Sequence, residues 1–192
     1  MSRLDLVVGP NGAGMTTFVE QVLAPQRPGA LLVNADIIAA ERWPDDAETH
    51  AYEAAKIAEA TRSALIKAGK EIIAETVFSH PSKLELVDEA LAAGYFVALH
   101  VLMLPEDLAV ARVAYRVERG GHAVPVEKIR GRYTRLWTYV AHAAEKASSA
   151  AFWDNASLDG PLLVAEIESG VLLSKPRWPT WAPASLTERW AL

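Results

Sequence analysis

The residues best suited to chemistry lie near the start of the chain, between positions 9 and 17. This segment has the spacing of the pattern G-x-x-x-x-G-K-[ST] and consists of Gly9, Pro10, Asn11, Gly12, Ala13, Gly14, Met15, Thr16 and Thr17. In that pattern, backbone N–H groups surround nucleotide phosphates, the Lys contacts the β- and γ-phosphates, and the Ser or Thr hydroxyl binds Mg²⁺. The sequence therefore predicts ATP or GTP binding at residues 9–17, with Mg²⁺ on Thr16.

Met15 stands where the pattern has its lysine. Met has nearly the length of Lys but no ammonium group, so we expect an unchanged fold and weaker nucleotide binding. Groups that meet charge developing in phosphoryl transfer change rates by about 10³–10⁵, so turnover should fall close to zero. Met15 is either a substitution that silences a kinase or a natural residue. In the second case the protein only binds nucleotides, or takes a lysine from elsewhere.

Short apolar runs alternate with helical stretches, the pattern of βαβ units around a parallel sheet. We expect strands at 3–8, 30–34, 71–75, 96–103 and 151–154, and helices at 15–23, 47–68, 81–93, 106–118 and 126–147. Residues 162–173 are expected to form a hairpin or a strand plus turn. The predicted fold class is α/β, a P-loop NTPase-type three-layer sandwich with a mainly parallel sheet of about five strands. All of residues 1–192 are expected to form one domain.

Two polar sites follow expected strands, at Asn34-Ala35-Asp36 and at Glu75-Thr76. Ligands of open α/β sheets bind at the carboxyl ends of the strands, so these side chains should face the phosphate loop. One carboxylate can serve Mg²⁺ or its waters, and the other can accept a proton from an attacking hydroxyl. Two alternatives remain open. The first is Asp36 as the N-cap of a helical turn at 37–42, and the second is Glu75 as a structural hydrogen-bond acceptor.

Basic residues gather between positions 112 and 135, where the only acidic residues are Glu118 and Glu127. The cluster consists of Arg112, Arg116, Arg119, Lys128, Arg130, Arg132 and Arg135. A Gly-Gly break at 120–121 separates two helices, which favours a lid at about 106–135 that closes over phosphates, because the arginine fork pairs well with phosphate oxygens. The alternative is that these basic residues lie on a solvated helix face and bind no phosphate.

The composition limits the classes of partner. The 192 residues contain no cysteine and carry a net charge of −5, which argues against nonspecific nucleic-acid binding. Nothing approaches the 20 apolar residues of a membrane span, and no signal peptide is expected, so we expect a cytoplasmic protein. The segment 176–192, rich in Trp and Pro, is expected to pack on the domain rather than dock a partner.

The chain resembles the zeta-toxin-like P-loop kinases over about residues 3–157. The resemblance rests on the segment 9–14, Asn34-Ala35-Asp36, Glu75-Thr76, Gly94-Tyr95, the block 116–125 (Arg-Val-Glu-Arg-Gly-Gly-His-Ala-Val-Pro), Arg132-Tyr133 and Asp154-Asn155. It implies phosphorylation of a small molecule by ATP or GTP with Mg²⁺. For the better-known zeta toxins the acceptor is the sugar 3′-hydroxyl of UDP-N-acetylglucosamine, and an antitoxin blocks the nucleotide site.

The resemblance also implies roles for individual residues. Asp36 is the expected general base, and Arg119 and Arg132 are the expected phosphate clamps, with Arg116 and Arg130 as competitors for these roles. Glu75, Thr76 and His122 are expected on the acceptor side. Arg116, Asp154 and Asn155 are expected to contact the nucleotide. The competing hypothesis is a nucleotide-binding regulatory module that transfers no phosphate; a polynucleotide kinase is less favoured, because the arginines are confined to one hinge region.

Overall fold

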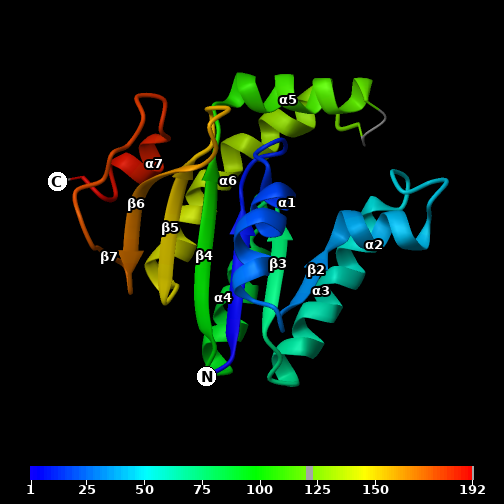
Figure 1. Cartoon of the computed structure of the whole chain (residues 1–192), viewed down its shortest axis with the longest axis horizontal. Helices are drawn as coiled ribbons and strands as arrows, with labels where there is room; N and C mark the ends of the chain where they lie inside the picture. Colours follow the sequence, from blue (N-terminus) through cyan, green and yellow to red (C-terminus); the bar gives the residue numbers. More distant parts are fainter. Residues whose placement is uncertain (120–122, 192) are drawn as a thin grey trace.

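A seven-stranded sheet forms the centre of the computed structural model, which describes residues 1–119 and 123–191 (Figure 1). The strand order is β2-β3-β1-β4-β5-β6-β7; β1 to β5 are parallel, and β6 and β7 are antiparallel. The strands are β1 (Arg3–Val8), β2 (Leu31–Asn34), β3 (Ile72–Thr76), β4 (Phe96–Met103), β5 (Ser149–Asp154), β6 (Leu162–Glu168) and β7 (Val171–Leu172). The predicted α/β sandwich with a mainly parallel sheet is confirmed.

The expected number of five strands is wrong, because residues 162–173 add to the main sheet. Ser169 and Gly170 both have positive φ values, 49° and 82°, and reverse the chain between β6 and β7. The resulting hairpin pairs β6 with β5, from Ser149 opposite Glu168 to Asp154 opposite Leu162. The sheet is therefore extended on the side away from β2.

Helices lie on both faces of the sheet. They are α1 (Met15–Phe18), the π-helical turn η1 (Val19–Leu23), the 3₁₀ turn η2 (Ala24–Gln26), α2 (Ala35–Arg42), α3 (Ala51–Lys67), α4 (Ser82–Ala92), α5 (Glu106–Glu118), α6 (Val126–Lys146) and α7 (Ala184–Thr187). The helix expected at 47–68 begins only at Ala51. The preceding residues form turns in which the Trp43 ring stacks on His50, with 4.5 Å between the ring centroids.

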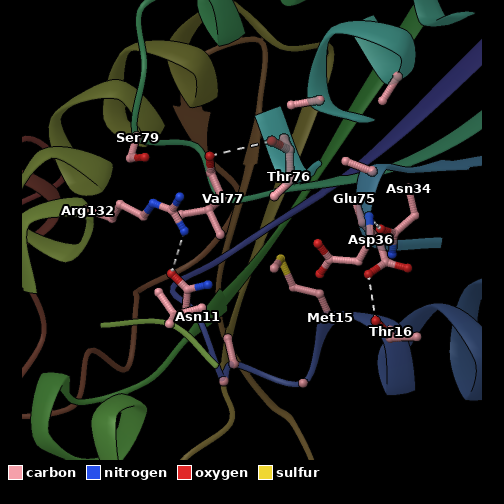
Figure 2. A pocket seen from close by; sticks show the side chains of 18 of the residues that line it. Asn11, Met15, Thr16, Asn34, Asp36, Glu75, Thr76, Val77, Ser79 and Arg132 are labelled. Carbon is pink, nitrogen blue, oxygen red and sulfur yellow. Dashed lines mark hydrogen bonds between the residues drawn. The ribbon is translucent and has the colours of Figure 1, made fainter. Parts of the chain in front are cut away.

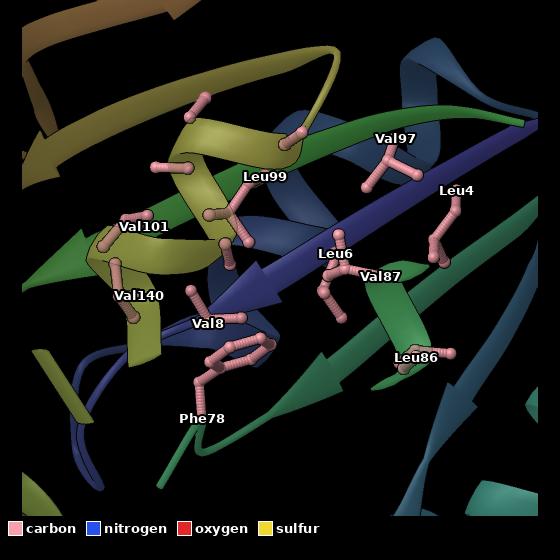
Figure 3. Close-up of a cluster of buried hydrophobic side chains, with 14 of the residues drawn as sticks. Leu4, Leu6, Val8, Phe78, Leu86, Val87, Val97, Leu99, Val101 and Val140 are labelled. Carbon is pink, nitrogen blue, oxygen red and sulfur yellow. The ribbon is translucent and has the colours of Figure 1, made fainter. Parts of the chain in front are cut away.

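The alternation of side chains along β1 divides the core between the two faces. Leu4, Leu6 and Val8 pack with residues of α3, α4 and α6, including Val87 and Val140 (Figure 3). Val7 instead packs with residues of α1, η1 and α5 on the other face. Both faces of β1 are therefore covered, which explains the apolar run Leu6-Val7-Val8 at its carboxyl end.

The segment after β7 packs against the outer strands of the sheet. Leu186 and Trp190 are buried in the same cluster as β1 and β4. The rings of Trp178 and Phe152 meet edge to face at 5.3 Å. None of the helices within residues 1–119 and 123–191 has the length and apolar character needed to cross a membrane.

Candidate active site

A cavity of about 510 Å³ lies at the carboxyl ends of β1, β2 and β3 (Figure 2). The parallel register places Val8 beside Thr76 and Asn34 beside Glu75, so the ends of the three strands meet. The described residues that line the cavity are 11–17, 34–36, 51, 55, 58, 62, 75–77, 79, 83, 112, 116, 124 and 132. The phosphate loop and the strand-end carboxylates therefore face one space.

The loop after β1 has the backbone geometry that its glycines permit. Gly12 and Gly14 have φ values of 80° and 83°, in the left-handed region that a side chain disfavours. A Cβ atom on Gly9 would lie 2.6 Å from the carbonyl oxygen of Leu102. Gly9 and Pro10 are buried behind the loop, whereas residues 11–17 line the cavity. Residues 11–17 can therefore contact a ligand directly, and Gly9 and Pro10 shape the loop.

Met15 is the first residue of α1 and lines the cavity. Its side chain points into the cavity, with Asp36 on one side of it and Asn11 and Arg132 on the other (Figure 2). It also packs against the cluster formed by Phe18, Val19 and Leu104. The sulfur thus occupies space where the sequence pattern would place an ammonium group.

Thr16 and Glu75 are joined across the cavity by a hydrogen bond. The Thr16 hydroxyl donates to Oε2 of Glu75 at 2.9 Å. Glu75 is 6% exposed, and its Oε1 is buried with no hydrogen-bond partner among the described residues. Burial raises the pKa of Glu75; hydrogen bonds from Thr16 and Asn34 oppose this rise, and the charges of Asp36 and Glu20 add to it.

This pair of residues fits a divalent cation. Mg²⁺ binds through one or two carboxylates together with hydroxyl, water and phosphate oxygens. Thr16 and the unpartnered oxygen of Glu75 supply two such ligands, and the charge of Asp36 lies close enough to affect Glu75. The structure thus places Glu75 beside the loop threonine. This position suits metal binding at least as well as the expected contact with the acceptor.

Asp36 lies in the first turn of α2, with its side chain exposed toward the cavity. The cap of this helix is Asn34, whose Oδ1 accepts a hydrogen bond of 2.8 Å from the Asp36 N–H. The alternative reading of Asp36 as a cap is therefore wrong. Since Asn34 satisfies the helix end, the Asp36 carboxylate is left available to the cavity.

Three arginines of the expected lid line the cavity: Arg112, Arg116 and Arg132. Arg112 donates to the carbonyl of Ala156 at 3.3 Å, and Arg132 donates to Oδ1 of Asn11 at 3.5 Å. Both guanidinium groups are therefore held near the phosphate loop by weak contacts that a ligand can replace.

The structure corrects the expectation for Arg119. It follows the end of α5, with φ −103° and ψ 19°, so it leaves the helix face shared by Arg112 and Arg116. Its guanidinium lies 4.3 Å from the centre of the exposed Tyr115 ring, outside the cavity lining. Arg130 also points away, and pairs with Glu106 at 3.2 Å and with Asp107 at 2.9 Å.

Asp154 and Asn155 support the loop and are not among the residues that line the cavity, so their expected contact with the nucleotide stays a prediction. The Asn155 amide donates to the Ala13 carbonyl at 2.7 Å, and Asp154 accepts from the Ala156 N–H at 2.9 Å. Thr76 lies on the cavity wall, where its hydroxyl donates a long bond of 3.4 Å to the Val77 carbonyl. His122 lies outside the described residues.

Two cations of the cavity were missed from the sequence, Arg62 of α3 and Lys83 of α4. Both occur among polar residues of helices, where a solvated position is the usual expectation. The signal for Arg62 was its spacing, because Ala54, Ala58 and Ile66 stand four residues apart in one buried row that includes it. Arg62 accordingly is only 3% exposed.

A family model described as an AAA domain matches residues 4–136. The chain belongs to this family. The matched region contains the phosphate loop, both carboxylates, Arg62, Lys83 and the three cavity-lining arginines. No curated protein sequence matches the chain.

Several solved structures resemble the fold of this chain at low sequence identity. The AvrRxo1-ORF1:AvrRxo1-ORF2 structure with sulphate ions has a TM-score of 0.73 and 14% identity, over 92% of this chain and 61% of that chain. The same complex with ATP has a TM-score of 0.69 at 14% identity, over 95% of this chain and 66% of that chain. The PezAT toxin-antitoxin system of Streptococcus pneumoniae gives 0.63 at 14% identity, over 86% and 71%.

A further match is a candidate kinase from Chloroflexus aurantiacus, with a TM-score of 0.55 at 20% identity, over 68% of this chain and 76% of that chain. The predicted likeness to zeta-toxin-like P-loop kinases is thus confirmed in family and fold. This chain spans less than two thirds of the matched AvrRxo1 chains.

Proposed function

We propose that this protein is a phosphotransferase that moves the γ-phosphate of ATP or GTP to a hydroxyl of a small molecule. The observation that carries the proposal is the single cavity in which the loop residues 11–17, Asp36, Glu75 and three arginines meet. Phosphoryl transfer depends on positioning and on charge stabilisation more than on covalent chemistry by the protein. This set of side chains offers both.

The loop and the arginines bind the donor in this proposal. Backbone N–H groups of residues 11–16 surround its phosphates. Arg112, Arg116 and Arg132 supply positive charge from α5 and α6, which act as a lid over about residues 106–135. When bound at Thr16 and Glu75, Mg²⁺ would neutralise charge on the β- and γ-phosphates.

Asp36 is the proposed general base. The acceptor oxygen forms a new bond to the γ-phosphorus while the bond between that phosphorus and the β–γ bridging oxygen breaks. The hydroxyl proton passes to the Asp36 carboxylate, and the nucleoside diphosphate leaves with the electron pair. Thr76 and, by the resemblance alone, His122 are the residues proposed to contact the acceptor. The proposed acceptor is a sugar hydroxyl of a nucleotide sugar such as UDP-N-acetylglucosamine.

Met15 limits this reaction because no ammonium group stands where charge develops. The three cavity-lining arginines supply part of the missing charge. We expect weak ATP binding and transfer that is lost or greatly slowed. The alternative function, a nucleotide-binding regulatory module, is favoured by this one residue and disfavoured by Asp36, since a protein that only binds needs no base at that position.

The test compares the protein with its Met15→Lys variant, each given Mg²⁺-ATP or Mg²⁺-GTP and a panel of nucleotide sugars. Labelled γ-phosphate should appear on an acceptor with Met15→Lys, at a rate about 10³-fold or more above the unchanged protein. Binding of ATP by both proteins, with no hydrolysis and no labelled acceptor, would identify the regulatory module instead.

A protein partner and a cytoplasmic setting are also part of the proposal. The AvrRxo1 and PezAT structures are both complexes or systems of two proteins. By analogy, an antitoxin that blocks the nucleotide site would suit a kinase of zeta-toxin type. Co-expression with a candidate antitoxin, followed by size-exclusion chromatography, tests this: separate elution of the two proteins would contradict it.

A further inference from the structure

Arg62 is a buried cation with no partner in the described chain. Its side chain is 3% exposed, and its Nε is buried without a hydrogen-bond acceptor among the described residues. Within residues 1–119 and 123–191 no hydrogen bond or salt bridge reaches the guanidinium. Burial lowers the pKa of Arg62, opposed by the charge of Glu59. Glu59 itself is exposed, so it only partly offsets the cost of burying the guanidinium.

Lys83 reinforces the same region of the cavity. It is half-buried in the first turn of α4 and lines the cavity together with Arg62. Burial lowers the pKa of Lys83, the nearby charge of Arg62 lowers it further, and Glu59 raises it. Two cations held close together at a partly buried wall repel each other, and an anion between them would remove this repulsion.

These cations stand apart from the group proposed for the nucleotide. Arg62 and Lys83 belong to α3 and α4, whereas Arg112, Arg116 and Arg132 belong to α5 and α6. The α3 residues Ala51, Ala55 and Ala58 line the cavity between Arg62 and the start of the helix, and their small side chains leave room there. The volume of about 510 Å³ is within the range of cavities that take small organic ligands.

We propose that Arg62 and Lys83 form a second anion site in the cavity, which binds a phosphate group of the acceptor. That the bound ligand is the acceptor rests on the proposed function. The anion site itself is inferred from the two cations alone. The Arg62 fork can bind two phosphate oxygens, and the Lys83 ammonium can bind a third. The acceptor class is therefore a phosphate-bearing sugar, and neutral sugars should bind poorly.

The experiment separates this site from the phosphate loop by saturating the loop first. In the Met15→Lys background with Mg²⁺ and a non-hydrolysable ATP analogue, calorimetry measures binding of N-acetylglucosamine, its 1-phosphate and UDP-N-acetylglucosamine. The two phosphate-bearing ligands should bind at least tenfold more tightly than the neutral sugar. The substitutions Arg62→Met and Lys83→Met should each weaken their binding about tenfold or more. A larger effect on the UDP-sugar than on the 1-phosphate would assign the site to the diphosphate.

Lys67→Met, at an exposed position of α3, is the matched control and should bind all three ligands unchanged. The ATP analogue should bind every variant within twofold of the parent. If Arg62→Met does not fold, the Lys83→Met variant, at a half-buried position, still tests the site. Equal binding of the neutral and phosphorylated sugars, or unchanged binding by Lys83→Met and by any folded Arg62→Met, would overturn the site.

A transfer assay on the same proteins distinguishes failure of the two proposals. Phosphate-dependent binding that requires Lys83, without transfer to any sugar, supports the anion site and contradicts the kinase. Transfer that is equally efficient with neutral and phosphorylated sugars supports the kinase and contradicts the anion site.

Discussion

The Thr16 hydroxyl donates a 2.9 Å hydrogen bond to Oε2 of Glu75, so the loop threonine and the carboxylate at the end of β3 form one unit. The sheet creates this relationship, because β3 lies directly beside β1 with Val8 paired to Thr76. The other Glu75 oxygen is buried and has no hydrogen-bond partner in the part of the chain that the structure describes. A buried carboxylate oxygen without a hydrogen-bond partner destabilises the metal-free protein, and a cation bound to that oxygen would remove the cost.

The substitution Glu75→Gln should therefore stabilise the metal-free protein and abolish its response to Mg²⁺. The folded-state pKa of Glu75 is raised, so the folded state holds the proton more tightly than the unfolded state does. Its contribution to stability is then present at low pH and is lost as pH rises through the folded pKa. Above that pKa, we expect Gln to raise the free energy of unfolding by about 1 kcal/mol or more.

Thermal unfolding at pH 5 and pH 8, with and without Mg²⁺, measures both effects. The gain from Gln should be larger at pH 8 than at pH 5. Glu71→Gln is the control, since Glu71 precedes the same strand and is exposed. A Glu75→Gln protein that keeps the full Mg²⁺ stabilisation would show that Glu75 is not a metal ligand.

Arg132 and Arg119 should differ in their effect on nucleotide binding. Arg132 lines the cavity and contacts Asn11 of the loop, whereas Arg119 stacks on Tyr115 outside it. Loss of a charge-assisted contact costs about 1.5–3 kcal/mol, so Arg132→Gln should weaken ATP binding about tenfold to a hundredfold. Arg119→Gln should leave the Kd within twofold. Equal losses in a titration with fluorescent ATP would contradict the placement of Arg119 outside the site.

Asp5 should make stability depend on pH in the acid range. This carboxylate is 1% exposed at the centre of β1 and contacts Arg3 at 2.9 Å, Arg27 at 3.3 Å and His100 at 2.9 Å. Burial alone would raise its pKa, but hydrogen bonds and charges from His100 and Arg3 lower it to about 2. The stabilisation of about 2 kcal/mol is present above the unfolded value near 3.8 and is lost as pH falls toward 2.

Urea unfolding between pH 5 and pH 2 tests this dependence of the stability on the charge of Asp5. Asp5→Asn should be less stable than the parent at pH 5, and the difference should narrow as the pH approaches 2. Asp45→Asn, an exposed position, should follow the parent throughout. A constant difference between Asp5→Asn and the parent across this range would mean that Asp5 contributes by packing and not by its charge.

The sequence predicted the local features of the site and missed those that depend on packing. The glycine spacing specified the loop, and the apolar runs placed Asn34 at the end of β2 and Glu75 next to the end of β3. The bond between Thr16 and Glu75 required the pairing of β1 with β3, which no local pattern encodes. Arg119 was misplaced because helical spacing was continued past Glu118, where α5 ends.

Asp36 offers the sharpest test of the catalytic proposal. Asn34 caps α2 through the Asp36 N–H, so the Asp36 carboxylate is not required for the helix end. It faces the cavity near Met15 (Figure 2), where a lysine at position 15 would also meet the donor phosphates. Asp36→Asn retains the shape and removes the basic oxygen. In the Met15→Lys background we expect kcat to fall by about 10²–10⁴, with little change in the Kd for ATP.

The control for this measurement is Glu41→Gln, on the same helix but outside the cavity lining. Its kcat should match that of the Met15→Lys parent. Thermal unfolding of Asp36→Asn should stay close to the parent, because the cap at Asn34 is intact. If kcat survived in Asp36→Asn, the proton would have to leave through another group, and the carboxylate of Glu75 beside Thr16 would become the candidate base.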